Sequence, residues 1–135
     1  MTLRISLKDG EKMIVNGAVL RAVGRTDLVV ENQVSLMRGR EVMTPEEATT
    51  PARRLYFACM LAYIGGEDGL AAQQDQIVTL LGDLVAALEA DEAKATCAQI
   101  AHRLATGDYY RALGECRSLI AYETQALGRV ENRAA

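Results

Sequence analysis

Over the first third of the chain, apolar and polar residues alternate with a period of two. In "LRISL" (3–7), Leu3, Ile5 and Leu7 fall on one face, which is the pattern of a strand with one buried side. Similar short apolar runs follow up to residue 43. We therefore expect four or five strands there, arranged as a compact antiparallel sheet or small barrel.

A β-hairpin is predicted over "KMIVNGAVLR" (12–21). Asn16-Gly17 is the pair that most readily adopts the two positive φ angles of a type I′ turn. A two-residue loop fixes the register, so Lys12 should face Arg21 across the hairpin. Like charges in that position are destabilising, so the pair either binds an anion or extends into water at small cost.

At Thr44 the pattern changes from strands to helices. Thr44, Pro45 and Glu47 have the spacing of a capping box with proline at the first helical position. A second start signal follows at Thr50, and a helix is predicted over 51–64.

Beyond this helix, apolar residues recur at heptad-like spacing in three stretches. The breaks at 89–92 and 106–108 are short, which predicts antiparallel helices packed as a bundle. Leu84, Ile100 and Ile120 sit in mid-stripe, and we expect them in the core. The three stripes are Ile77, Leu81, Leu84 and Leu88; Ala93, Cys97, Ile100 and Leu104; and Leu113, Cys116, Ile120 and Leu127.

Together these patterns predict an α+β fold, with a small N-terminal antiparallel β-module (1–43) followed by an antiparallel helical bundle (44–135). The β-module holds seven Lys/Arg and five Asp/Glu, whereas the bundle holds eight and thirteen. An anionic partner would be steered toward the β-module, although a slightly basic sheet is also simply a solvated surface. The cations that could contact such a partner are Arg4, Lys8, Lys12, Arg21, Arg38 and Arg40.

The six aromatic residues all lie between Tyr56 and Tyr122, and the β-module has none. A base-stacking platform on the sheet is therefore not expected. If the sheet binds RNA, it should do so through Arg and Lys contacts to phosphates and through polar contacts to unstacked bases.

Residue types that carry catalysis or bind metals are sparse. His102 is the single histidine, and the sequence has no glycine-rich phosphate loop of common spacing. Cys59, Cys97 and Cys116 are odd in number and far apart, which indicates reduced core thiols rather than a disulfide framework. We expect no enzyme activity, no cofactor and no metal.

The location predicted for the chain is the cytoplasm, without membrane contact. It has no signal-peptide pattern, and its longest apolar run, 55–64, is too short to span a bilayer. This run is apolar on every side, so either the β-module or another chain should cover it. The residues that would form a partner interface, including one between two copies in a homo-oligomer, are Arg53, Arg54, Tyr56, Met60 and Tyr63.

Three stretches resemble the FlbT family of flagellum-biogenesis regulators: "LRISLKDGEKMIVNGAV" (3–19), "TPARRLYFACMLAYI" (50–64) and "GDYYRALGECRSLIAYETQALGR" (107–129). The resemblance implies a post-transcriptional repressor of flagellin synthesis. Its expected partner is the 5′ untranslated region of a flagellin mRNA, whose degradation the family promotes. In some bacteria the family acts positively, and it works alongside FlaF-type proteins.

The N-terminal stretch is also similar, more weakly, to the opening of CsrA-type translational regulators. The shared features are the Gly10-Glu11 turn and the Met-Ile strand after it, but Leu7-Lys8 stands where those proteins have adjacent arginines.

The competing interpretation of the chain's function is a protein-interaction adaptor. In it, the apolar 55–64 helix or the acidic bundle would dock flagellin or a FlaF-type protein, and any effect on RNA would be indirect.

Overall fold

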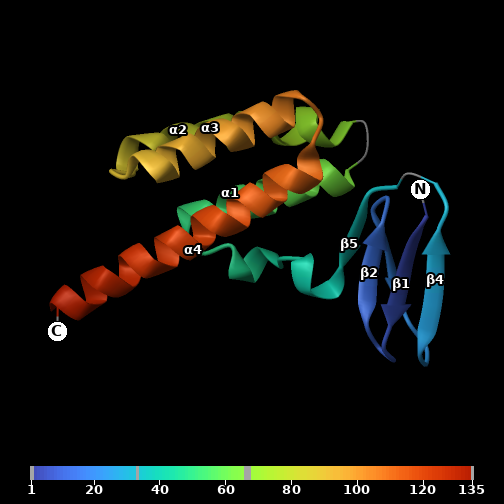
Figure 1. Ribbon diagram of the computed structural model, residues 1–135. Helices are drawn as coiled ribbons and strands as arrows, with labels where there is room; N and C mark the ends of the chain where they lie inside the picture. Colours follow the sequence, from blue (N-terminus) through green and yellow to red (C-terminus); the bar gives the residue numbers. More distant parts are fainter. Residues whose placement is uncertain (1, 33, 66–67, 135) are drawn as a thin grey trace.

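The computed structural model describes residues 2–32, 34–65 and 68–134. Within them, the strands gather at one end of the molecule and the helices extend to the other, which confirms the α+β prediction (Figure 1). The strands are β1 (Leu3–Leu7), β2 (Lys12–Val15), β3 (Ala18–Arg21), β4 (Thr26–Val30) and β5 (Leu36–Arg38). They are followed by the 3₁₀ helices η1 (Gly39–Glu41) and η2 (Pro45–Glu47), and by α1 (Pro51–Ile64), α2 (Gly69–Ala87), α3 (Asp91–Ala105) and α4 (Tyr109–Ala134).

Two separate antiparallel sheets form the β-module, where the sequence pattern predicted one sheet or a barrel. β1 pairs with β4, and the second sheet has the order β3-β2-β5. The turn after β3 explains the difference. Gly24 has a φ of 75°, and its N–H donates to Asp9 Oδ1 at 2.8 Å. This turn leads the chain away from β3, so β4 pairs with β1 instead of extending the hairpin.

The predicted hairpin is confirmed in turn type and register. Asn16 and Gly17 have φ values of 49° and 85°, as a type I′ turn requires. Lys12 lies opposite Arg21, and both side chains are exposed.

β2 contributes to two hydrophobic clusters. Met13 packs with Ile5 and Leu7 of β1 in a small cluster between the two sheets. The next residue, Ile14, points to the opposite face and joins Met37 in the large core of the bundle. The core of the bundle therefore extends to one face of β2 and to β5, while the small cluster between the two sheets is separate from it.

Helix α1 begins at Pro51, as predicted. The Thr50 side chain accepts a hydrogen bond from the Arg53 N–H at 3.3 Å. A carboxylate from α4 also caps this end, because Ala52 N donates to Glu123 Oε2 at 3.0 Å. Both contacts satisfy backbone donors that a helix start leaves open.

The bundle packs α1 against α2 and α4, and α3 against α2 and α4. Leu84 and Ile100 are buried, which confirms two of the three core predictions, whereas Ile120 is only partly buried. α4 projects past the other helices in Figure 1, which fits the half-exposed state of Leu127 near its end. Leu119, which lies outside the predicted stripe, is buried instead of its neighbour Ile120.

The first and second helix start signals have different outcomes. The Thr44–Glu47 capping box forms, with Thr44 N donating to Glu47 Oε1 at 3.0 Å, but it begins only the short η2.

In the described parts of the chain, no helix combines the length and the hydropathy needed to cross a membrane.

Candidate nucleic-acid interface

A cavity of about 530 Å³ opens beside β1 and β5. Four cations line it, namely Lys8, Arg25, Arg38 and Arg40, together with one carboxylate, Glu11. Guanidinium groups bind phosphate through paired N–H donors, so this composition suits a phosphate-bearing ligand.

A second cavity, of about 390 Å³, shares Arg38 and Arg40 with the first. Its remaining lining residues are Glu41, Tyr110 and Arg117. Because the two cavities share a wall, the five cations form one continuous surface from the strands to α4. We call it the basic trough, defined by Lys8, Arg25, Arg38, Arg40 and Arg117.

Arg38 is fixed in the middle of the trough. Its Nη2 donates to the Ser6 carbonyl oxygen at 2.8 Å and lies 3.6 Å from Glu11 Oε2. The other Glu11 oxygen accepts from the Lys8 N–H at 3.0 Å. The Glu11 carboxylate therefore already has two partners within the protein. The Arg38 side chain is about one-third exposed.

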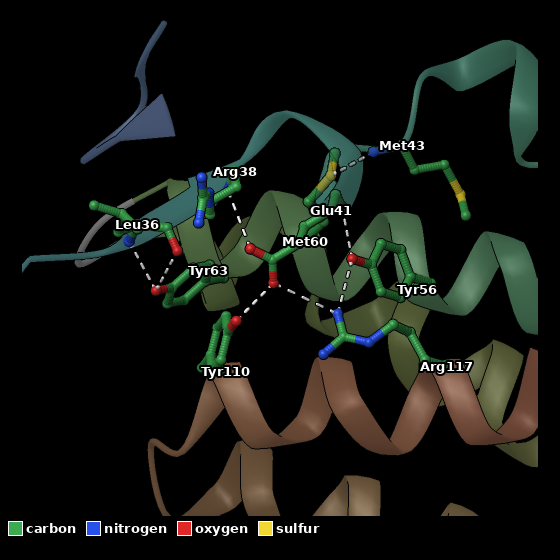
Figure 2. Close-up of polar contacts among 9 residues, drawn as sticks. All are labelled: Leu36, Arg38, Glu41, Met43, Tyr56, Met60, Tyr63, Tyr110 and Arg117. Atoms are coloured by element: carbon green, nitrogen blue, oxygen red, sulfur yellow. Dashed lines mark hydrogen bonds and ion pairs between the residues drawn. The ribbon is translucent and has the colours of Figure 1, made fainter. Parts of the chain in front are cut away.

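Glu41 joins the trough to the bundle, as Figure 2 shows. Its carboxylate accepts from Tyr110 Oη at 2.6 Å and from the Arg38 N–H at 3.1 Å, and it lies 3.7 Å from Arg117 Nη1. Its backbone carbonyl accepts from Tyr56 Oη at 2.6 Å. We call Glu41, Tyr56, Tyr110 and Arg117 the junction cluster, because they connect η1 to α1 and α4.

The surroundings of three tyrosines near this cluster raise the pKa of their phenol groups. The hydrogen bond to the Glu41 carboxylate raises the pKa of Tyr110. Burial raises the pKa of Tyr56 and of Tyr63. The Tyr63 hydroxyl donates to the Leu36 carbonyl oxygen at 3.1 Å and accepts from its N–H at 2.8 Å, so β5 is also attached to α1 (Figure 2).

The structure divides the six cations proposed from the sequence. Lys8, Arg38 and Arg40 line the trough, whereas Arg4, Lys12 and Arg21 are exposed but line neither cavity.

Sequence reasoning missed Arg25 and Arg117 as members of the trough. Arg25 reaches it because β4 pairs with β1, with Thr26 opposite Leu7, and no local signal specified that pairing. Arg117 reaches it through the packing of α4. Tyr110, which is 45% exposed, also lines the second cavity and supplies an aromatic ring that the strands lack.

The expected partner interface on α1 is largely internal. Tyr56 and Met60 are buried, and Tyr63 is partly buried, because the segment from β5 to Met43 covers this face. The Met43 N–H, for example, donates to Met60 Sδ at 3.3 Å (Figure 2). The chain itself thus provides the cover that the sequence required, and Tyr56 and Met60 are not available as surface residues.

The other two residues proposed for this interface differ in exposure. Arg53 is partly buried, and Arg54 is exposed on α1. Their place in a partner interface stays a prediction.

The three thiols lie in the core, as their sequence context predicted. Cys59 and Cys116 face each other with sulfur atoms 4.0 Å apart, and this contact together with burial raises the pKa of Cys116. Burial also raises the pKa of Cys97. Buried thiols are poor nucleophiles. His102 is exposed, and the described residues contain no cluster of potential metal ligands.

Comparison with known proteins gives a consistent set of relatives. A family model described as "Flagellar protein FlbT" matches residues 3–127. The "Probable flagellum biosynthesis repressor protein FlbT" of Caulobacter sp. (strain K31) is 37% identical over 131 residues, which cover 96% of this chain and 99% of that protein. The "Flagellum biosynthesis repressor protein FlbT" of Caulobacter vibrioides (strain ATCC 19089 / CIP 103742 / CB 15) is 35% identical, with 98% and 94% coverage. No solved structure shows significant similarity to this chain.

Proposed function

Since this chain belongs to the FlbT family of flagellar proteins, we propose that it represses flagellin synthesis after transcription, by binding the 5′ untranslated region of flagellin mRNA and promoting its degradation. Its relatives are named as flagellum biosynthesis repressors, and its general role is the regulation of flagellar synthesis. Because its proposed target is a messenger RNA, we propose that the chain acts in the cytoplasm. These names describe regulation and not an enzymatic reaction.

The basic trough is the observation that supports RNA as the ligand. It has five cations and two carboxylates, and both carboxylates already accept hydrogen bonds from the protein. Arg25 and Arg40 are exposed, so their guanidinium groups are accessible to successive phosphates of a flexible strand.

Tyr110 supplies a second element of such a site. Its hydroxyl is fixed by Glu41, and its ring packs at 5.9 Å, tilted by 48°, against the ring of Tyr63. A ring held in this way at the wall of a cationic cavity can stack on an unpaired base, which contributes about 1–3 kcal/mol per base. The proposed site therefore combines phosphate contacts with one stacking position.

The test is binding of the purified chain to its own flagellin leader across a series of salt concentrations. Arg25→Glu with Arg40→Glu should weaken binding and flatten the salt dependence, by about 0.7 in the logarithmic slope for each phosphate that the variant no longer neutralises. Lys12→Glu with Arg21→Glu is the matched control, because it reverses the same number of exposed cations outside the trough.

The outcomes distinguish the trough from the hairpin as the RNA-binding surface. Weaker binding only in the trough variant supports the proposed site. Weaker binding only in the hairpin variant assigns the RNA contact to Lys12 and Arg21. Wild-type affinity and salt slope in both variants contradict direct RNA binding by either cationic surface. A scrambled leader shows whether any binding depends on sequence.

The adaptor remains a second candidate because of one feature of the bundle. A small apolar groove of about 170 Å³ lies between α2 and α3, lined in part by Ile77, Val78 and Leu104. In this alternative the groove accepts an amphipathic helix of flagellin or of a FlaF-type protein. Val78→Lys would then abolish capture of that protein. In this alternative the purified wild-type chain would not bind RNA.

A further inference from the structure

The β-module exposes more large apolar side chains than it buries in its own core. The small cluster between its sheets contains Ile5, Leu7, Met13 and Ala22 as its buried members. The exposed large hydrophobic residues of the β-module are Leu3, Val19, Leu20, Val23, Leu28 and Val29. Contiguous exposed apolar surface on a soluble domain marks an interaction site.

Most of this apolar surface follows β3 and β4. Leu20 lies on the same sheet face as Met13, and Leu28 lies on the same face as Ile5, so both belong to the inner faces of the two sheets. They are nevertheless 47% and 37% exposed. The space between the sheets is therefore open on this side of the β-module.

The strand edges on this side are also unpaired. Among the described residues, β3 pairs only with β2, and β4 pairs only with β1. The turn over 22–25 joins the two strands, so their free edges lie close together, and Val23 within that turn is 83% exposed. Free edges beside apolar side chains are templates for a further strand.

We propose that a second copy of this chain closes the open side, with β3 of each copy pairing antiparallel to β4 of the other. A two-fold axis parallel to the strands brings about both pairings at once. It makes each three-stranded sheet continuous with the two-stranded sheet of the second copy. The interface is isologous, so every contact occurs twice.

The sequence of the two strands favours one register. With Leu20 opposite Leu28 of the second copy, Val19 faces Val29 and Arg21 faces Asp27. Every inner-face residue then meets an inner-face residue, as a continuous sheet requires. Arg21 and Asp27 are both exposed in the single chain, and although Asp27 Oδ1 accepts from the Ser6 hydroxyl at 2.8 Å, the carboxylate can also pair with Arg21.

Neighbouring registers are disfavoured by the same residues. A shift of two residues in one direction places Arg21 opposite Arg25, and in the other direction it places Val19 opposite Glu31. A shift of one residue would place an inner-face side chain opposite an outer-face one. Apolar pairing and charge complementarity therefore select the same alignment.

The exposed apolar side chains lie mainly where the two copies meet. Five of the six belong to β3, to β4 or to the turn between them, and Leu3 belongs to β1. Apolar atoms supply more than half of the area of a standard interface, and this surface has that composition.

Sedimentation equilibrium of the full chain tests the proposal. The wild type should be a dimer at micromolar concentration. Leu20→Lys should raise the dimer dissociation constant roughly a hundredfold, because it places a charge on the inner face of the sheet twice in an isologous interface. Val85→Lys is the matched control, since Val85 is 43% exposed on α2 and lies outside the proposed interface. Circular dichroism checks that both variants are folded.

A charge swap tests the register. Arg21→Asp and Asp27→Arg should each weaken the dimer, and the two together should restore it. A wild type that sediments as a monomer up to about 0.1 mM would overturn the proposal. Equal effects of Leu20→Lys and Val85→Lys would also overturn it, and a double swap that fails to restore the dimer would overturn the register. None of these measurements involves RNA, so they are independent of the proposed function.

Discussion

Glu41→Ala should weaken the attachment of the β-module to the bundle. The Glu41 side chain is only 16% exposed. It accepts hydrogen bonds from the Tyr110 hydroxyl and from the Arg38 N–H, and it lies beside Arg117 (Figure 2). Alanine removes all of these interactions together and leaves the backbone of η1 in place.

The expected destabilisation follows from the individual interactions. Hydrogen bonds to a charged group contribute about 1.5–3 kcal/mol each when buried, and the partly exposed Tyr110 hydroxyl can recover part of this from water. The ion pair with Arg117 adds about 1 kcal/mol or less, because Arg117 is 45% exposed. We therefore expect the free energy of unfolding to fall by about 2–4 kcal/mol.

Urea denaturation, monitored by circular dichroism, measures this destabilisation. Glu46→Ala is the control, because Glu46 is a nearby exposed carboxylate on η2. Glu41→Gln should give an intermediate effect, since an amide oxygen can still accept one hydrogen bond but carries no charge. If Glu41→Ala and Glu46→Ala have the same midpoint, the junction cluster does not stabilise the fold and this reasoning is refuted.

Three further predictions concern the core and the alkaline limit of stability. Leu84→Ala should lower the free energy of unfolding by about 2–5 kcal/mol in urea denaturation, because Leu84 is buried. Gly69→Ala should lower the melting temperature through about 1–3 kcal/mol of overpacking, because a Cβ would clash with the Ala62 carbonyl oxygen where α2 meets α1. Burial raises the pKa of Tyr56 above 10.0, so the folded state favours the protonated phenol. Stability should therefore be complete below pH 10 and fall as the pH rises through the raised pKa, and Tyr56→Phe should make that fall shallower in pH-dependent melting.

Local signals in the sequence predicted the features that depend on neighbouring residues. The Asn16-Gly17 turn and its register followed from backbone conformational preference alone. The beginning of α1 after Thr50 followed from capping chemistry. Leu84 and Ile100 were placed correctly in the core because helical periodicity is strong where a helix has one apolar face.

Long-range pairing was outside the reach of these signals. Nothing near β4 indicates that β1 is its partner, and so the position of Arg25 in the trough could not be inferred. Glu41 carries no signal of its own in the sequence, yet it joins Tyr110 and Arg117, which are about seventy residues further along the chain. Such contacts depend on how the helices pack, which the pattern of apolar residues constrains only loosely.

The charge distribution sets a condition on any RNA contact at the trough. The chain carries a net charge of −3, so at long range it repels a polyanion weakly. At physiological ionic strength this repulsion is screened beyond about 8 Å, and within that distance the nearest charges dominate. Glu41 forms an ion pair with Arg117, and Glu11 forms one with Arg38. Among the described contacts, the trough cations without a carboxylate partner are Lys8, Arg25 and Arg40. RNA affinity should therefore depend on these three residues far more than on the net charge of the chain.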